Sequence, residues 1–547
     1  MKRTFLLLLF FITATVFSFG QADTVVVPSV YNGDALGALN KFILGDTLSN
    51  GDRANPDRYY KLERNSIYFL NGEFHADFDL RLIADPADAD NKPPVVASTT
   101  GSDGSPQLIQ FQLTGNAYIK NIIFELTPPS GSGESNASFF LAGEDKDYYF
   151  DNCKWEWGLW MQIATVVPVN KIVVTNCYFR NPEHKTNIYN GRGIGFYLQN
   201  PADTVIMVNN SFFNMNSFAF VADNGSIPPL YFRFDHNTIV NEMKWPIHSY
   251  WISNAEVTNN LFYNAHSFGE DAIDVVGQGP EGLLYGLVNI SPIPSNILSW
   301  YGITENERKY KVLNNAYYYS QDVLDYLSSY SLEVEPFMNS RTLGMFDNDS
   351  EYPNLDFSTL YNLDPNFVEI GTGTTSMITW MQKKRNVQNN TYWGWDPDGD
   401  KFSFQWPIAE DLAYTDETLL SGAQGGFPVG DLNWYPEKKT EWESWYPTEV
   451  KDITYAISKD LSIEAIYPNP ADNDINLTLN VEKNTQLKVY LINLNGELID
   501  VLFDSKISSG KHDLNFNISN LGISTGNYIL ECRSNNSMVS QKIQFLR

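Results

Sequence analysis

The sequence predicts an all-β protein whose main domain is a solenoid of stacked strands. A short phrase beginning with Asn recurs at Asn121, Asn152, Asn176, Asn210, Asn237, Asn260 and Asn315. Most copies are flanked by β-branched or aromatic residues, and several are followed by a second Asn at Asn181, Asn214, Asn241 and Asn264. Self-similarity at a period of tens of residues is typical of stacked repeats, because one repeat cannot bury its apolar face alone.

The spacing and composition of the repeat favour strands over helices. Successive phrases lie 31, 24, 34, 27, 23 and 55 residues apart. Because Asn289 divides the longest interval, we predict a degenerate rung there. The segments are rich in Val, Ile, Phe, Tyr, Asn and Gly, which suit strands and turns. Equivalent side chains of parallel rungs lie about 4.8 Å apart, so an Asn ladder can satisfy backbone groups at buried bends.

Residues 1–22 are predicted to be a secretory signal peptide. Lys2 and Arg3 precede an apolar run from Phe5 to Phe19, and small residues follow it. The run is too short for a membrane-spanning helix, and no other stretch approaches about 18 apolar residues. We therefore expect an exported mature chain without a transmembrane segment.

Residues 23–66 are predicted to form a short N-terminal helical cap. Asp34 can begin a helix that Gly45 ends. The apolar positions at helical spacing are Leu36, Leu39, Phe42 and Ile43. A cap is required because the first rung would otherwise expose an unpaired edge. This helix, followed by the strand-like run at 67–72, resembles the cap of right-handed parallel β-helix proteins of the pectate-lyase-like group, and the resemblance implies that fold for residues 67–385.

Residues 460–547 are predicted to form a small C-terminal β-sandwich domain. Alternating apolar segments are separated there by Asn, Gly and Asp turns. The domain resembles the type A C-terminal sorting domain of the Bacteroidetes type IX secretion system at Tyr467–Pro470, at Val489–Tyr490 and at Gly526–Tyr528. The resemblance implies binding to the type IX secretion machinery, delivery to the medium or the outer cell surface, and removal of the tail on arrival.

Residues 386–459 are predicted to be a C-terminal cap and linker. They are rich in Trp, Tyr, Pro, Asp and Gly, and the regular repeat is lost before them. Within them, Gly426–Trp434 resembles a closing segment of β-helix proteins from the same bacteria.

Charge and cysteine content restrict the partners. The formal net charge of −28 argues against nucleic acid, because affinity for a phosphate backbone depends largely on Lys and Arg. Cys153 and Cys177 each directly follow a repeat Asn, so we expect them to stack in neighbouring rungs. The rung spacing is compatible with two buried thiols or with a disulfide.

Distances from the repeat Asn predict a basic groove. Five residues lie 6 to 11 positions after an Asn of the repeat, namely His184, Lys185, Lys244, His248 and His266. Equivalent positions of neighbouring rungs stack in space, so these side chains are expected to line one groove, with Arg192 and Trp245 at its edges. Either they form this groove or they are unrelated loop residues.

A basic groove would suit an acidic polysaccharide. In a lyase, a cation neutralises the uronate carboxylate while a base removes the neighbouring proton before β-elimination. We predict Lys244 or His248 as the base and Lys185 or Arg192 as the neutralising group. His184, His266 and Trp245 would then contact the substrate.

A second cluster is acidic and has three interpretations. Glu270, Asp271 and Asp274 supply the oxygen ligands that Ca²⁺ prefers, so calcium is the one cofactor that the pattern offers. Two such carboxylates could instead hydrolyse a glycoside. The cluster could also be a solvated turn.

These observations lead to one function class with three variants. We expect an exported β-helix protein that interacts with polysaccharide, either as a lyase acting on an acidic glycan, as a noncatalytic glycan-binding or adhesion protein, or as a glycoside hydrolase.

Overall fold

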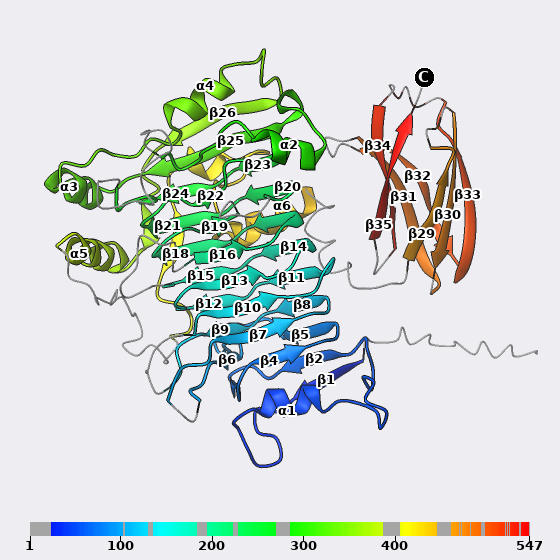
Figure 1. The fold of residues 1–547 in the computed structure, drawn as a ribbon, viewed down its shortest axis with the longest axis horizontal. Coiled ribbons are helices and arrows are strands. Elements are labelled where there is room, and N and C mark those ends of the chain that lie inside the picture. The colour runs from blue at the N-terminus through cyan, green and yellow to red at the C-terminus, as the bar shows by residue number, and fades with distance from the viewer. Residues whose placement is uncertain are drawn as a thin grey trace, which may run out of the picture.

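The computed structural model describes residues 23–101, 104–129, 135–182, 194–222, 228–269, 285–386, 405–445 and 461–545, the last range without 470, 472, 482, 494–497, 520, 522, 524–525 and 535–537. The main domain is a parallel β-helix in which most coils pass through three rows of strands (Figure 1). The structure therefore confirms the predicted all-β fold. No helix of the described residues is long and apolar enough to cross a membrane.

Rows 1 and 2 together make a 19-stranded sheet. Row 1 contains β1 (Thr24–Val27), β2 (Tyr59–Leu62), β5 (Leu80–Ala84), β8 (Ala117–Lys120), β11 (Asp147–Asp151), β14 (Val169–Thr175), β17 (Ala202–Val208), β20 (Tyr231–Asp235) and β23 (Asn254–Thr258). Row 2 contains β3 (Ile67–Phe69), β6 (Val95–Ala97), β9 (Ile123–Glu125), β12 (Lys154–Glu156), β15 (Tyr178–Arg180), β18 (Ser211–Met215), β21 (Thr238–Glu242) and β24 (Leu261–Tyr263). The long strands β25 (Lys309–Tyr318) and β26 (Leu355–Asn362) run through both rows and join them.

Row 3 is a separate seven-stranded parallel sheet. It contains β4 (Phe74–Ala76), β7 (Ile109–Leu113), β10 (Ala137–Leu141), β13 (Met161–Thr165), β16 (Ile194–Leu198), β19 (Phe220–Val221) and β22 (Ile247–His248). Alternate residues of all three rows point into one shared apolar core.

Aromatic rings stack along the interior of row 2. The ring of Trp155 lies 5.5 Å from Phe124 and 4.7 Å from Phe179, and Phe179 lies 4.8 Å from Phe212. All four side chains are fully buried. Because each aromatic residue removes about 150–250 Å² from water, this stack supplies a large share of the core energy.

Asn residues form the bends between rows 1 and 2. The bend positions adopt positive φ and are Asn121, Asn152, Asn176, Asn209, His236, Asn259 and Asn314. The next residue of each coil points inward, and these residues are Ile122, Cys153, Cys177, Asn210, Asn237, Asn260 and Asn315. The predicted phrase therefore begins at the bend in its first three copies but one residue later in its last four. A shift of one residue exchanges the two faces of a strand, so Phe213, Val240 and Tyr263 face outward instead of joining the stack.

The inward Asn residues make the predicted ladder. The backbone N–H of Asn210 donates to Oδ1 of Asn237 (3.1 Å), and the N–H of Asn237 donates to Oδ1 of Asn260 (2.8 Å). The N–H of Asn260 donates to Oδ1 of Asn315 (2.9 Å). Asn260 and Asn315 are thus in direct contact, and the predicted rung at Asn289 is wrong. Asn289 instead hydrogen-bonds to the backbone of Gly286 in a segment outside the strands.

The N-terminal cap contains the expected helix with a different start. Helix α1 (Ala38–Leu44) has Gly37 as its N-cap and ends at Gly45, as predicted. Asp34 does not cap it, because its carboxylate accepts from the N–H of Leu36 and from Lys41. Leu36 is exposed, whereas Leu39 and Ile43 are buried against the first coil.

Helices cover the outer face of row 2 near the later coils. Helices α3 (Gln321–Ser329) and α5 (Gly373–Arg385) pack against the outward side chains of Phe213 and Val240. The remaining short elements of this part are α2 (Ser295–Tyr301), η2 (Glu305–Glu307), α4 (Ser340–Phe346), β27 (Phe367–Glu369), β28 (Asp411–Tyr414), η3 (Leu419–Ser421), η4 (Leu432–Trp434) and α6 (Pro436–Trp445).

The C-terminal domain is a β-sandwich of two antiparallel sheets with its own apolar core. One sheet contains β29 (Leu461–Tyr467), β30 (Asp474–Val481) and β33 (Gly510–Asn517). The other contains β32 (Leu498–Ile507), β31 (Thr485–Asn493), β34 (Gly526–Arg533) and β35 (Met538–Phe545). This is the small sandwich that the sequence predicts.

Candidate functional site

A strap formed by residues 405–434 runs along the outside of the β-helix. Its first part contacts an early coil, where the indole N–H of Trp406 donates to the backbone oxygen of Asp88 (2.7 Å). Its last part contacts later coils, where the N–H of Gly430 donates to the oxygen of Asn259 (2.7 Å). Residues predicted to close the end of the solenoid therefore lie against its side.

The strap packs this closely because a glycine faces the wall. Gly430 has φ of +92°, and a Cβ atom there would lie 2.4 Å from Oγ1 of Thr238. Nδ1 of His236 donates a hydrogen bond to the backbone oxygen of Gly430 (3.0 Å). A larger residue would push the strap off the wall.

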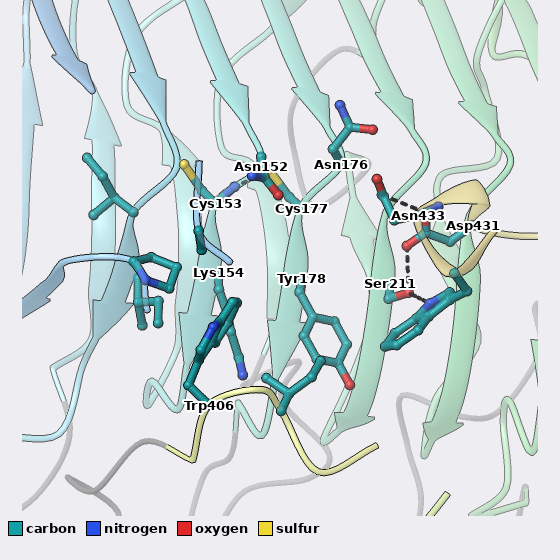
Figure 2. A pocket seen from close by; sticks show the side chains of 16 residues that line it. Asn152, Cys153, Lys154, Asn176, Cys177, Tyr178, Ser211, Trp406, Asp431 and Asn433 are labelled. Atoms are coloured by element: carbon teal, nitrogen blue, oxygen red, sulfur yellow. Dashed lines mark hydrogen bonds between the residues drawn. The ribbon is translucent and has the colours of Figure 1, made fainter. Parts of the chain in front are cut away.

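A cavity of about 280 Å³ lies between the strap and row 2. Its lining residues are Ala87, Pro93, Ile122, Ile123, Asn152, Cys153, Lys154, Asn176, Cys177, Tyr178, Ser211, Trp406, Ile408, Asp431, Asn433 and Trp434. Figure 2 shows Trp406 at the same end as Lys154 and Tyr178, and Asp431 at the opposite end. Asn152 is exposed, so the cavity opens to solvent beside it.

One face of the cavity is a ladder of outward side chains. Ile123, Lys154, Tyr178 and Ser211 begin four successive strands of row 2 and are partners in register. Neighbouring rungs lie about 4.8 Å apart, so the ladder presents a different chemical group at each step. The strap supplies the opposite face with two indole rings, one carboxyl group and one amide.

Beside the aromatic end lies a buried network of charges. Arg180 contacts Glu156 (2.6 Å) and Glu410 of the strap (3.0 Å), and Lys154 contacts Glu156 (2.9 Å). The hydroxyl of Tyr178 donates to Glu410. Burial and the neighbouring Arg180 lower the pKa of Lys154, whereas burial and the charge of Glu410 raise that of Tyr178.

The other end of the cavity contains a carboxyl group with three donors. Asp431 accepts hydrogen bonds from the hydroxyl of Ser211 (2.8 Å) and from the backbone and side-chain nitrogens of Asn433 (2.8 and 2.7 Å). The indole N–H of Trp434 donates to the same hydroxyl of Ser211 (2.9 Å). Burial nevertheless raises the pKa of Asp431 to about 7.

Four residues of the predicted basic groove gather at the corner between rows 2 and 3. The ring of Trp245 lies 5.4 Å from that of His248 and 5.2 Å from that of His266, and the N–H of His266 donates to the oxygen of Lys244 (3.0 Å). Lys244, Trp245 and His266 are fully buried, whereas His248 is partly exposed. Burial lowers the pKa of His248 to about 4 and that of His266 well below its usual value.

Six other predicted site residues lie outside the described part of the chain. They are His184, Lys185 and Arg192 of the groove and Glu270, Asp271 and Asp274 of the acidic cluster. Among the described residues there is no group of three His, Cys, Asp or Glu side chains that could hold a metal ion.

Cys153 and Cys177 stack in neighbouring rungs as predicted, and both are free buried thiols. The N–H of Cys153 lies 3.4 Å from Sγ of Cys177. Burial raises the pKa of Cys177, so this thiol stays protonated. The pair continues the Asn ladder, because the N–H of Cys177 donates to Oδ1 of Asn210 (2.9 Å).

Few features of the sequence indicate the cavity. Its two faces come from segments that are about 200 residues apart in the chain, and the charges of Lys154 and Arg180 lie in strands that resemble their neighbours. One signal is present in the sequence. Gly426–Trp434 resembles a closing segment of β-helix proteins, and this resemblance distinguishes it from the surrounding chain.

Comparisons with known proteins concern mainly the C-terminal domain. Residues 465–545 match the family described as the secretion system C-terminal sorting domain, which confirms the predicted resemblance. A search of curated proteins gave no match. One similar solved structure is the Pseudomonas fluorescens alkylpurine DNA glycosylase AlkC bound to DNA containing an abasic site analogue, at 11% identity and TM-score 0.14 over 21% of this chain and 40% of that chain. This likeness is too slight to support any conclusion.

Proposed function

We propose that the β-helix binds a polysaccharide without cleaving it. The chain carries a type IX secretion sorting domain, so the protein is secreted or held on the outer cell surface, and the polysaccharide would be bound there. The single observation that carries the proposal is the cavity beneath the strap, where aromatic rings and amides converge around about 280 Å³ of open space.

The lining of the cavity suits a sugar. Pyranose rings present apolar C–H faces and a rim of hydroxyl groups. Trp406, Tyr178 and Trp434 offer aromatic surfaces, while Asn176 and Asn433 offer amides. Ligand sites commonly combine apolar walls with a few such polar groups.

The volume limits what enters. Ligand pockets span roughly 300–1,000 Å³, and this cavity of about 280 Å³ is slightly smaller than that range. It would accept a single sugar unit, either a chain end or a side branch. The rest of the glycan would continue past Asn152 into solvent.

Binding without cleavage agrees better with the described residues than a lyase does. A catalytic base must come within hydrogen-bond reach of the proton that it removes. Lys244 and His266 have no exposed surface, and Nδ1 of the partly exposed His248 faces the hydroxyl of Tyr250 (3.2 Å). The cleaving alternatives, a lyase and a glycoside hydrolase, become outcomes of the same experiment.

The test is a glycan panel incubated with the mature chain. Binding is measured by isothermal titration calorimetry, while unsaturated products and reducing ends are followed in parallel. We expect binding by at least one glycan and no product. Trp406→Ala should weaken that binding about tenfold, since stacking on an aromatic ring contributes roughly 0.5–1.5 kcal/mol beyond the buried area.

The matched control is Trp300→Ala. Trp300 lies on α2, is 46% exposed and does not line the cavity. It should leave affinity unchanged. Equal effects of the two substitutions, or no binding by any glycan, would contradict the proposal, and a released product would replace it with an enzyme.

A further inference from the structure

We propose that the cavity beneath the strap selects an uncharged sugar unit and rejects a uronate or a sulfated sugar. This inference rests on the proposed glycan binding and gives it a substrate class. It is opposite to the acidic glycan that the predicted basic groove would favour.

The cations beside the cavity are already neutralised. Lys154 is the one cation among the described lining residues, and its ammonium contacts Glu156. Arg180 lies between Glu156 and Glu410, with both carboxylates within 3.0 Å. These four side chains are buried, so the pairs are weakly screened by solvent.

The charge of this network is zero or negative in either state of Lys154. With Lys154 protonated, two cations face Glu156 and Glu410. Loss of its proton, which the lowered pKa favours, leaves one cation against two carboxylates. Glu125 adds another buried acid, because it is the partner of Glu156 in register on the outer face of row 2.

The amide of Asn176 also favours a ligand that can donate a hydrogen bond. The amide nitrogen of Asn176 donates to Asp151 (2.6 Å), which fixes the amide so that its oxygen points elsewhere. That oxygen has no partner but is buried beneath the cavity surface, so a ligand reaches it only after a rotation of the Asn176 side chain. A sugar hydroxyl could then donate to it, whereas an ionised carboxylate or sulfate has only acceptors.

An anionic sugar would therefore lose its hydration without gaining a partner. Burying a charge is costly unless a counter-ion or several donors replace the water. In this cavity the anion would meet the carboxyl group of Asp431 and a cation network already paired. A neutral unit avoids this cost.

The experiment compares two oligosaccharides that share linkage and length, one neutral and one with a uronate in place of each neutral unit. The full mature chain should bind the neutral form at least about tenfold more tightly. Glu156→Gln removes a carboxylate from Lys154 and Arg180 and should shift the ratio toward the uronate form by about tenfold. Glu410→Gln, which releases Arg180 from the strap side, provides a second variant should the first fail to fold.

The matched control is Glu333→Gln, which changes net charge equally at an exposed residue outside the cavity. It should not alter the ratio. Tighter binding of the uronate form by the unmodified protein would overturn this inference while the proposed function stands, as would equal shifts from Glu156→Gln and Glu333→Gln. No binding of either form in the wider panel would remove both.

Discussion

Replacement of Asn237 by Ala tests how the Asn ladder stabilises the β-helix. Asn237 is fully buried at the bend between rows 1 and 2. Its Oδ1 accepts from the backbone N–H of Asn210 (3.1 Å), and its Nδ2 donates to the backbone oxygen of Met207 (3.0 Å). Alanine would remove both partners without admitting water.

The expected cost follows from those two backbone groups. Each buried donor or acceptor left without a partner costs about 1–3 kcal/mol, so the substitution should lower the free energy of unfolding by about 2–6 kcal/mol. That is a large fraction of the 5–15 kcal/mol typical of whole domains. The exposed Asn170, whose side chain bonds to Asp147, provides the control, and Asn170→Ala should cost no more than about 0.5 kcal/mol.

Urea unfolding followed by far-ultraviolet circular dichroism measures both variants. We expect a clear fall in the midpoint for Asn237→Ala alone. Equal midpoints for the two variants would refute the reasoning, because they would mean that the ladder satisfies no backbone group of consequence.

Three further outcomes follow from buried groups. Glu410→Ala leaves Arg180 without one of its carboxylate partners and should destabilise the packing of the strap by about 3–5 kcal/mol. We expect faster hydrogen exchange in residues 405–434. Unchanged exchange there would contradict this prediction. The pKa of Asp431 is raised to about 7, so the folded state binds the proton of this carboxyl group more tightly than the unfolded state does. The resulting stabilisation is complete below about pH 4. It should fall by up to about 1.4 kcal/mol per pH unit as the pH rises to about 7. Asp431→Asn should flatten that part of the melting-temperature profile, and an identical profile would disprove the assignment. Thiol reagent should modify no cysteine of the native full-length chain and three after denaturation, namely Cys153, Cys177 and Cys532.

The fold was predictable because its signals are local and repeated. Most αL bends carry Asn, the strands carry β-branched and aromatic residues, and both features recur from coil to coil. The sorting domain was predictable for a different reason, since short motifs at Tyr467–Pro470 and Gly526–Tyr528 are specific to it.

The register was harder to predict than the fold. In the early coils the bend residue is Asn and the inward residue is Ile or Cys. In later coils Asn occupies the inward position, and the bend residue is Asn or, in one coil, His236. At Asn209 and Asn210 the two positions are adjacent and chemically identical, so the pattern cannot separate them. The incorrect rung at Asn289 has a different cause, because it was inferred from the length of the interval between Asn260 and Asn315, which are in fact adjacent in the ladder.

The cavity depends on long-range packing that no local pattern encodes. Arg180 and Glu410 are 230 residues apart in the chain, yet they form one buried ion pair. The strap could be recognised as a separate segment from Gly426–Trp434, but its position on the outside of row 2 depends on the fit of Gly430 against Thr238.

The most direct test of the central claim is a crystal structure of the protein with a bound neutral oligosaccharide. We predict one sugar ring inside the cavity, stacked on Trp406. A sugar bound elsewhere on the β-helix, with the cavity empty at saturating ligand, would contradict the account.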